Sequence, residues 1–171
     1  YDRVLLAGRI VGTTREPGFH YDFLLAEARR VVESDMPDPS RPGPGEPGEA
    51  AAPPDDHLSQ EFVQWANDNG LSVEQAVELA VHLHPVIIRS VYALDSRAEK
   101  ILCGAVELAN LSVVLAAIDS VARHGISNCL ESAIARAEQL PTRLHDSAAR
   151  SLSHMDDERA YAAGRRLVPP D

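Results

Sequence analysis

The chain has 171 residues and 44% of them are hydrophobic, so it is long enough and apolar enough to bury a core. Its net charge is −10 at pH 7, and acidic residues outnumber basic ones on both sides of residue 56. Nucleic acids and anionic membrane surfaces carry charge of the same sign, so neither is an expected partner.

The N-terminal part, residues 1–34, is predicted to be a helical segment that packs on the rest of the chain. Its first apolar run, Val4 to Val11, is interrupted by Gly8 and Arg9 and fits either a short strand or a first helix. From Phe19 to Ser34 the apolar residues follow helical spacing, which predicts an amphipathic helix.

Residues 35–56 are rich in proline and glycine and are predicted to form a disordered linker. Proline donates no backbone hydrogen bond, and the segment has little apolar surface to bury. A flexible tether is the favoured interpretation. The alternative is a proline-rich ligand that docks in an aromatic groove of another protein.

Residues 57–168 are predicted to form an α-helical bundle. The first helix, 57–69, carries an apolar stripe and ends at Gly70. Ser72 and Gln75 have the spacing of a capping box and open the second helix, while Pro85 is expected to start a third. A further helix is expected over 127–140, and two shorter, more polar helices are expected over 142–154 and 156–167.

The longest predicted helix covers about 97–124 and is apolar on nearly all sides. Only Glu107, Asn110 and Asp119 are strongly polar between residues 101 and 122. A helix that is apolar all round is expected at the centre of a bundle. A membrane span is not expected, because these three side chains would lie in hydrocarbon. A break near residues 110–112 would divide the segment into two helices.

Two cysteines, Cys103 and Cys129, lie in apolar helical pattern and form no C-x-x-C motif. We expect both to be buried, reduced thiols. Disulfides are rare in reducing compartments, so this expectation favours an intracellular, cytoplasmic protein.

The stretch 72–92 is also compatible with a helix-turn-helix that reads DNA. The run "ELAVHLHPVIIRS" resembles runs found in bacterial repressors, with one residue more in the turn. A second helix here would offer only Arg89 and Ser90 to the bases, and Glu74 and Glu78 lie on the first helix. Two ordinary bundle helices are therefore favoured, with a DNA-binding regulator as an alternative.

Catalytic and metal sites have no linear signature in this chain. The motifs G-x-S-x-G, G-x-G-x-x-G, the P-loop and H-E-x-x-H are all missing from the sequence. His82 and His84 diverge on a helix, whereas His145 and His154 lie near acidic residues in the polar C-terminal part. Solvated surface histidines are the favoured interpretation, and we expect neither a metal nor a cofactor. A small hydrolase without a linear motif is the enzymatic alternative.

The layout resembles that of the apoptosis-regulating bundles of the B-cell lymphoma type. The elements that carry it are an N-terminal helix, a long loop, a helix with Leu58, Phe62, Trp65, Ala66 and Asp68, and a central apolar helix. The sequence departs from that family's pattern, because "DSRAEK" stands where an Asn-Trp-Gly-Arg run would precede the central helix. The resemblance implies a groove beside the central helix that takes a partner's amphipathic helix.

We therefore expect a protein–protein interaction module, acting as a helical adaptor, a regulator or a homo-oligomer. The candidate partner-binding residues are Leu58, Phe62, Trp65 and Arg89. Aromatic side chains and arginine lead at binding hot spots. The alternative for Phe62 and Trp65 is that both rings simply seal the core.

Overall fold

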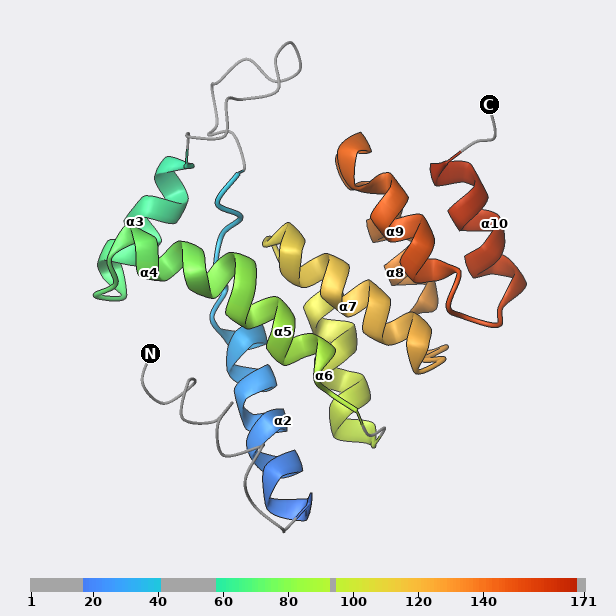
Figure 1. Ribbon diagram of the computed structural model, residues 1–171, viewed down its shortest axis with the longest axis horizontal. Coiled ribbons are helices and arrows are strands. Elements are labelled where there is room, and N and C mark those ends of the chain that lie inside the picture. The colour runs from blue at the N-terminus through green and yellow to red at the C-terminus, as the bar shows by residue number, and fades with distance from the viewer. Residues whose placement is uncertain (1–16, 41–57, 93–94, 169–171) are drawn as a thin grey trace.

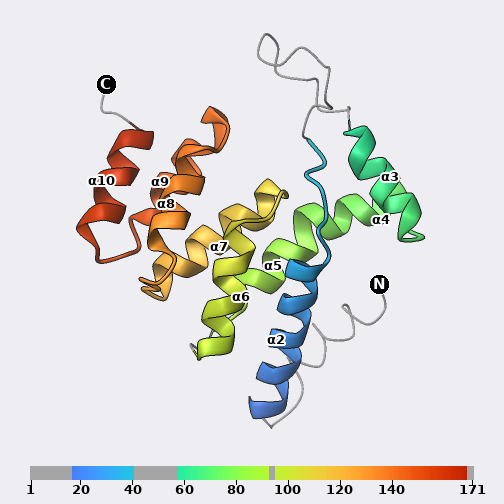
Figure 2. The ribbon, with the colours of Figure 1, turned by 180° about the vertical axis from the view of Figure 1, so that it is seen from behind.

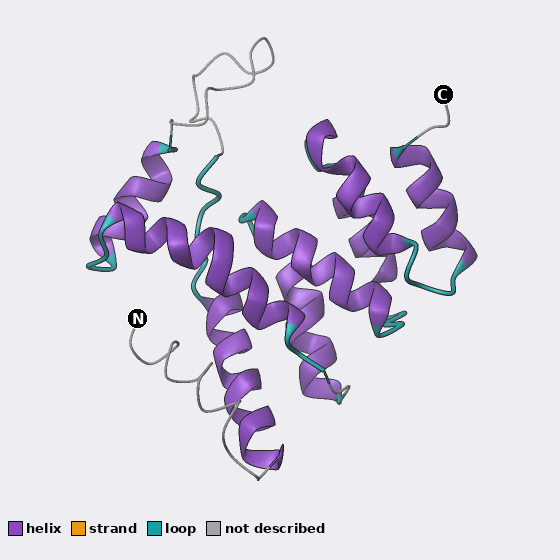
Figure 3. Ribbon diagram, viewed as in Figure 1, coloured by secondary structure: helices purple, strands orange, loops and turns teal. Residues whose placement is uncertain are grey.

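The computed structural model describes residues 17–40, 58–92 and 95–168. Within these ranges the chain is all-helical, as predicted, and contains no strand (Figure 3). The predictions for residues 1–16 and 41–56 lie outside the described residues. The helical elements in chain order are α2 (Pro17–Glu33), α3 (Gln60–Asp68), α4 (Val73–Glu78), η1 (Leu79–Leu83), α5 (His84–Arg89), α6 (Ser96–Val106), α7 (Leu111–Arg123), α8 (Leu130–Glu138), η2 (Thr142–Leu144), α9 (His145–Leu152) and α10 (Glu158–Leu167).

Helix α7 lies at the centre of the bundle (Figures 1 and 2). Helices α5, α6, α8 and α9 pack against it, while α2 packs against α5 and α6. Helix α10 covers α8 and α9 at the other end of the molecule (Figure 1). Nine residues of α7 are buried, which agrees with its apolar character on most sides.

The predicted single helix over 97–124 is wrong, because α6 ends at Val106 and α7 begins at Leu111. The open alternative, a break near residue 110, is confirmed. Asn110 causes it: its side-chain oxygen accepts hydrogen bonds from the backbone N–H groups of Ser112 and Val113, 3.0 and 3.3 Å away. This is N-cap geometry, in which an asparagine starts a new helix instead of continuing the old one.

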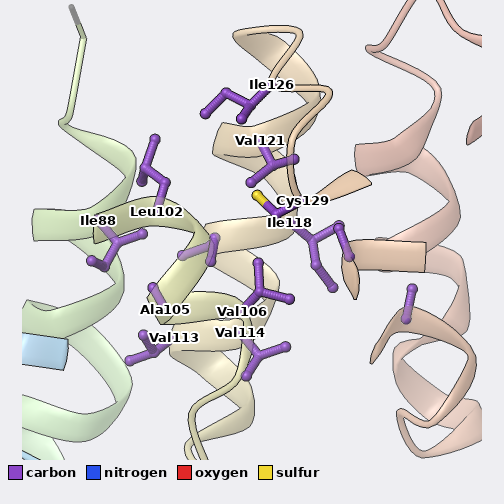
Figure 4. Close-up of a cluster of buried hydrophobic side chains, with 14 of the residues drawn as sticks. Ile88, Leu102, Ala105, Val106, Val113, Val114, Ile118, Val121, Ile126 and Cys129 are labelled. Atoms are coloured by element: carbon purple, nitrogen blue, oxygen red, sulfur yellow. The ribbon is translucent and has the colours of Figure 1, made fainter. Parts of the chain in front are cut away.

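The core is built from aliphatic side chains, and the described residues contain two clusters of buried side chains. The larger cluster includes Ile88 of α5, Leu102 of α6 and Ile118 of α7 (Figure 4). The smaller cluster contains Met36, Phe62 and three alanines under α3 and α4. Leucine, valine, isoleucine and alanine supply most of this burial, so close packing of small aliphatic groups stabilises the fold.

Helices α4 and α5 are not separated by a turn. Residues 73–89 form one continuous helical run with a π-helical segment, η1, in its middle. Pro85 accounts for it, because proline has no backbone N–H to donate to the preceding turn. The N–H of His84 donates to the carbonyl of Leu79, five residues back. In the same pattern, a backbone N–H at position 85 would donate to the carbonyl of Ala80. Proline has no such N–H, and this carbonyl accepts a hydrogen bond from Asn110 Nδ2 at 3.1 Å instead.

The start of the proline-rich stretch is ordered, so the predicted disordered linker does not begin at Asp35. Met36 is 3% exposed, and Asp38, also 3% exposed, accepts a hydrogen bond from the backbone N–H of Leu111 at 2.6 Å. Ser59 N–H donates to the carbonyl of Pro39 at 2.9 Å. Residues 35–40 therefore join α2 to the bundle through a capping contact on α7.

Cys103 and Cys129 form a disulfide, so the prediction of reduced thiols is wrong. Their Cα atoms lie 5.6 Å apart, and the bond ties α6 to the residue that precedes α8. The cysteines are 26 residues apart in sequence, and only the packing of α6 beside α8 brings them together. The expectation of a cytoplasmic protein had depended on reduced thiols and loses that support. No helix of the described ranges has the length and apolar character needed to cross a bilayer.

Candidate functional site

An apolar groove runs between α2 and α6, which lie side by side in both views (Figures 1 and 2). It has a volume of about 710 Å³. Apolar groups form most of its surface, and charged side chains stand along its edges. The lining residues are Asp22, Leu25, Ala26, Arg29, Val32 and Glu33 from α2, and Arg97, Lys100, Ile101 and Gly104 from α6.

Helical periodicity places these residues on facing sides of the two helices. Positions 22, 25, 26, 29, 32 and 33 recur at intervals of three and four, and so do positions 97, 100, 101 and 104. Gly104 allows α2 to come close, because a Cβ atom at that position would stand 3.3 Å from Val32 Cγ1. The groove is therefore narrow at Gly104. Towards the N-terminal end of α6, the long side chains of Arg97 and Lys100 line it.

The charged edges of the groove are partly paired. Arg97 bridges Asp22 at 3.0 Å and Asp95 at 2.8 Å, and its guanidinium lies 5.9 Å from the ring centroid of Tyr21. The backbone N–H of Ala98 and the Arg97 guanidinium lower the pKa of Asp95 below its usual range. These contacts hold the Arg97 guanidinium at the edge of the groove, where the two carboxylates balance its charge.

Two further basic groups stand along the same groove. On α2, Arg29 pairs with Glu33 at 2.6 Å. Lys100, the single lysine among the chain's 16 basic residues, makes no ion pair with any described residue. On the α6 edge, Lys100 therefore carries a positive charge that no described carboxylate pairs, in a chain whose net charge is −10.

The sequence-predicted binding residues lie elsewhere. Phe62 is fully buried in the smaller core cluster, stacked on Trp65 with ring centroids 6.4 Å apart. Trp65 is half-buried and donates its Nε1–H to the carbonyl of Ser34 at 3.3 Å. Leu58 is exposed and lies two residues before α3, and Arg89 is exposed at the end of α5. The burial of Phe62 supports the alternative of core packing, and partner binding by the four residues stays a prediction.

The stretch 72–92 lacks the turn that a helix-turn-helix requires. The residues between the two expected helices, 82–85, have helical backbone and belong to η1 and α5. Because the run is continuous, no second helix departs at the angle that seats a recognition helix in a major groove. The helical geometry of this segment therefore removes the main structural argument for DNA reading.

One histidine lies near a buried acid, at the junction of α7 and α9. His154 Nδ1 is 3.3 Å from Asp119 Oδ1, and Arg123 pairs with the same carboxylate at 2.9 Å. A carboxylate that is hydrogen-bonded to a histidine ring nitrogen is part of many hydrolytic sites. Here the neighbouring hydroxyl of Ser153 donates to the carbonyl of Arg150 instead. The described ranges also contain no group of three histidine, cysteine or acidic side chains that could hold a metal.

Sequence reasoning missed the groove residues of α2 and α6. The helical spacing in both segments was a usable signal for an apolar face, but nothing local in the chain indicates that these two faces meet.

Comparison of this chain with protein-family models, with curated proteins and with solved structures found no significant match.

Proposed function

We propose that the protein is an interaction module that binds an amphipathic helix of a partner protein in the groove between α2 and α6. The observation that carries the proposal is the groove itself, whose volume of about 710 Å³ is lined mostly by apolar groups. The lining residues of α2 extend from Asp22 to Glu33, a length of about 16 Å at 1.5 Å per residue. Such a groove accommodates about three turns of a helix, which binds through side chains at i, i+3, i+4 and i+7.

The charges along the groove indicate which helix would fit. Arg97 and Lys100 line the α6 edge, and Lys100 pairs with no described residue. A partner helix with glutamate or aspartate beside its apolar stripe would place a carboxylate near Lys100. Complementary charges at an interface mainly set specificity and association rate. We therefore expect an acidic helix and not a basic one.

A displayed peptide library tests the proposal even though the partner is unidentified. Each peptide of the library carries leucine and isoleucine at helical spacing along one face, and the positions that flank this face are randomised. We expect selection on the full chain to enrich glutamate and aspartate on one flank. The affinity of the selected peptides is then measured by fluorescence anisotropy.

Two matched alanine variants show where the selected peptides bind. Ala26 is exposed on α2 and lines the groove, so Ala26→Arg obstructs it without entering the core. Ala162 is exposed on α10, far from the groove in sequence and in contacts, so Ala162→Arg is the control. Arginine is a good helix former, so both variants should keep the fold. We expect at least a tenfold loss of affinity for Ala26→Arg and no loss for Ala162→Arg, which fits the loss of a central contact.

Three results would contradict the proposal: failure to enrich any peptide, enrichment of lysine on the flanks, or equal binding by Ala26→Arg and the wild type. Light scattering on the same samples identifies a different occupant. A dimer that Ala26→Arg converts to a monomer would assign the groove to a second copy of the chain and replace the partner helix in the proposal.

A further inference from the structure

A second pocket lies between α9 and α10, at the far end of the molecule from α2 (Figures 1 and 2). It has a volume of about 220 Å³ and shares no lining residue with the groove between α2 and α6. The two features are therefore separate, and an argument about this pocket does not depend on the proposed helix binding.

Close contact between α9 and α10 places two arginines at the same pocket. Ala149 of α9 lies against Gly164 of α10, where a Cβ atom would stand 3.4 Å from the Ala149 carbonyl oxygen. Arg150 follows Ala149 and Arg165 follows Gly164, and both arginines line the pocket. Because the pocket is small, a ligand that fills it contacts side chains from both helices.

Both arginines are available to a ligand. Arg150 and Arg165 are exposed, and their side chains make no ion pair and no hydrogen bond with any described residue. By contrast, Arg166, the next residue after Arg165, pairs with Glu138 of α8 at 2.6 Å. A ligand in solution can therefore reach two guanidinium groups without displacing a described carboxylate.

The pocket is basic although the chain as a whole is acidic. The chain has 26 acidic and 16 basic residues, yet the described residues that line this pocket include two arginines and no acid. The acidic side chains of residues 156–158 line an adjoining pocket instead. A concave surface with charge of one sign raises the local concentration of the opposite ion, so this pocket favours an anion.

Tyr161 and Val168 add an apolar wall to the same pocket. Their exposed fractions are 60% and 43%, and they are two of the six large hydrophobic side chains that are exposed among the described residues. A tyrosine provides a large, rigid contact area at little cost in conformational entropy. A ligand with a ring beside its anionic group would therefore cover this wall.

We propose that this pocket binds the phosphate monoester of a small ring compound, with the phosphate between Arg150 and Arg165 and the ring against Tyr161. A phosphate monoester has three free oxygens and a charge of about −1.5 to −2 at pH 7. A carboxylate has only two oxygens, which one guanidinium already satisfies in the bidentate geometry, so two arginines favour the phosphate. The size suits a single ring with its phosphate, because a cavity of about 150 Å³ holds benzene.

Phenyl phosphate, benzoate and phenol test the proposal, since they carry the same ring and differ in the attached group. The backbone amide signals of Ser153 and Gly164, two lining residues, report on the pocket in NMR spectra of the ¹⁵N-labelled full chain. We expect phenyl phosphate to shift both signals saturably and to bind at least about tenfold more tightly than phenol, because hydrogen bonds to charged groups are the stronger class. Benzoate and inorganic phosphate should each bind more weakly than phenyl phosphate, since one lacks the third oxygen and the other lacks the ring.

Replacing either arginine should weaken the binding of phenyl phosphate. We expect a loss of about tenfold for Arg150→Gln and for Arg165→Gln. Glutamine is a good helix former and neither arginine has a described partner, so both variants should keep the fold. Arg89→Gln is the matched control: Arg89 is also exposed and unpaired among the described residues, but it lies on α5 outside the pocket. It changes the net charge equally and should bind as the wild type does.

The absence of a saturable shift at Ser153 and Gly164 with phenyl phosphate at about 10 mM, ten times the dissociation constant of a weak 1 mM complex, would overturn the site. Equal affinities of the wild type for phenyl phosphate and phenol would overturn the choice of an anion, and equal affinities for phenyl phosphate and benzoate would overturn the choice of phosphate. Inorganic phosphate that binds as tightly as phenyl phosphate would overturn the ring contact with Tyr161. An equal loss in Arg89→Gln and in the two pocket variants would assign the binding to the overall charge of the chain and overturn the roles of Arg150 and Arg165.

Discussion

Reduction of the disulfide between Cys103 and Cys129 should lower the free energy of unfolding by about 3.5 kcal/mol. The bond closes a loop with a sequence separation of 26 residues. Restricting a loop of that length in the unfolded chain is worth about 3.5 kcal/mol at 25 °C on the loop-entropy relation. The loop contains the end of α6 and the whole of α7, so the bond constrains the central part of the bundle.

Urea unfolding of the full chain, with and without dithiothreitol, measures this contribution. Comparing the oxidised and reduced wild-type protein changes the bond alone, because no side chain is replaced. A Cys103→Ala/Cys129→Ala double variant serves as the control and should show the same midpoint with and without the reductant. Thiol labelling before reduction should find no reactive cysteine. An identical midpoint for the oxidised and reduced wild type, or two free thiols in the protein as isolated, would refute the reasoning.

Three further perturbations have expected outcomes. Acidification from pH 6.5 to pH 4 should lower the unfolding free energy by up to about 3 kcal/mol, because the pKa of His84 is about 4 in the folded chain and near 6.5 in the unfolded one. The unfolded state binds the proton first, so the loss begins as the pH falls below 6.5; His84→Leu should remove that part of the pH dependence, and an unchanged slope would argue against the buried ring. Asn110→Ala should cost about 2–3 kcal/mol in urea unfolding, since it removes the cap of α7 and leaves the carbonyl of Ala80 without a partner; a change below 0.5 kcal/mol would contradict this junction. Met36→Ala should cost about 2–3 kcal/mol if residues 35–40 are part of the core, whereas a residue in a free linker would change the stability by less than about 0.5 kcal/mol.

Local features of the fold were predictable where one short stretch contains the whole signal. Ser72 and Gln75 form the predicted capping box, with both reciprocal hydrogen bonds present. The amphipathic helix predicted from Phe19 to Ser34 corresponds to α2. In both cases the side chains that determine the structure lie within one or two turns of the backbone that they affect.

Features that depend on contacts distant in sequence were not predictable in this way. Asn110 was recognised as a polar interruption, but its second role, donating to the carbonyl of Ala80, depends on a π-helical segment 30 residues earlier. Pro85 was assigned to the start of a new helix because proline favours that position, yet here a π-helical turn accommodates it within a continuous run. The disulfide required the packing of α6 on α8, which no local pattern indicates.

The candidate groove illustrates the same limit. Ala26 and Ile101 are ordinary members of two amphipathic helices until α2 and α6 are placed side by side. Phe62 was predicted to bind a partner because aromatic side chains are common at binding hot spots. Only 5% of the residues in this chain are aromatic, and Phe62 fills the smaller core cluster instead. Residue type alone does not show whether an aromatic side chain binds a partner or is buried in the core.

The proposed helix binding is tested most directly by mapping a selected acidic peptide on the ¹⁵N-labelled full chain by NMR. We expect the largest amide shifts at residues 22–33 of α2 and 97–104 of α6, with little change in α9 and α10. Shifts concentrated on α9 and α10, or spread evenly over the chain without a maximum along the groove, would contradict the account.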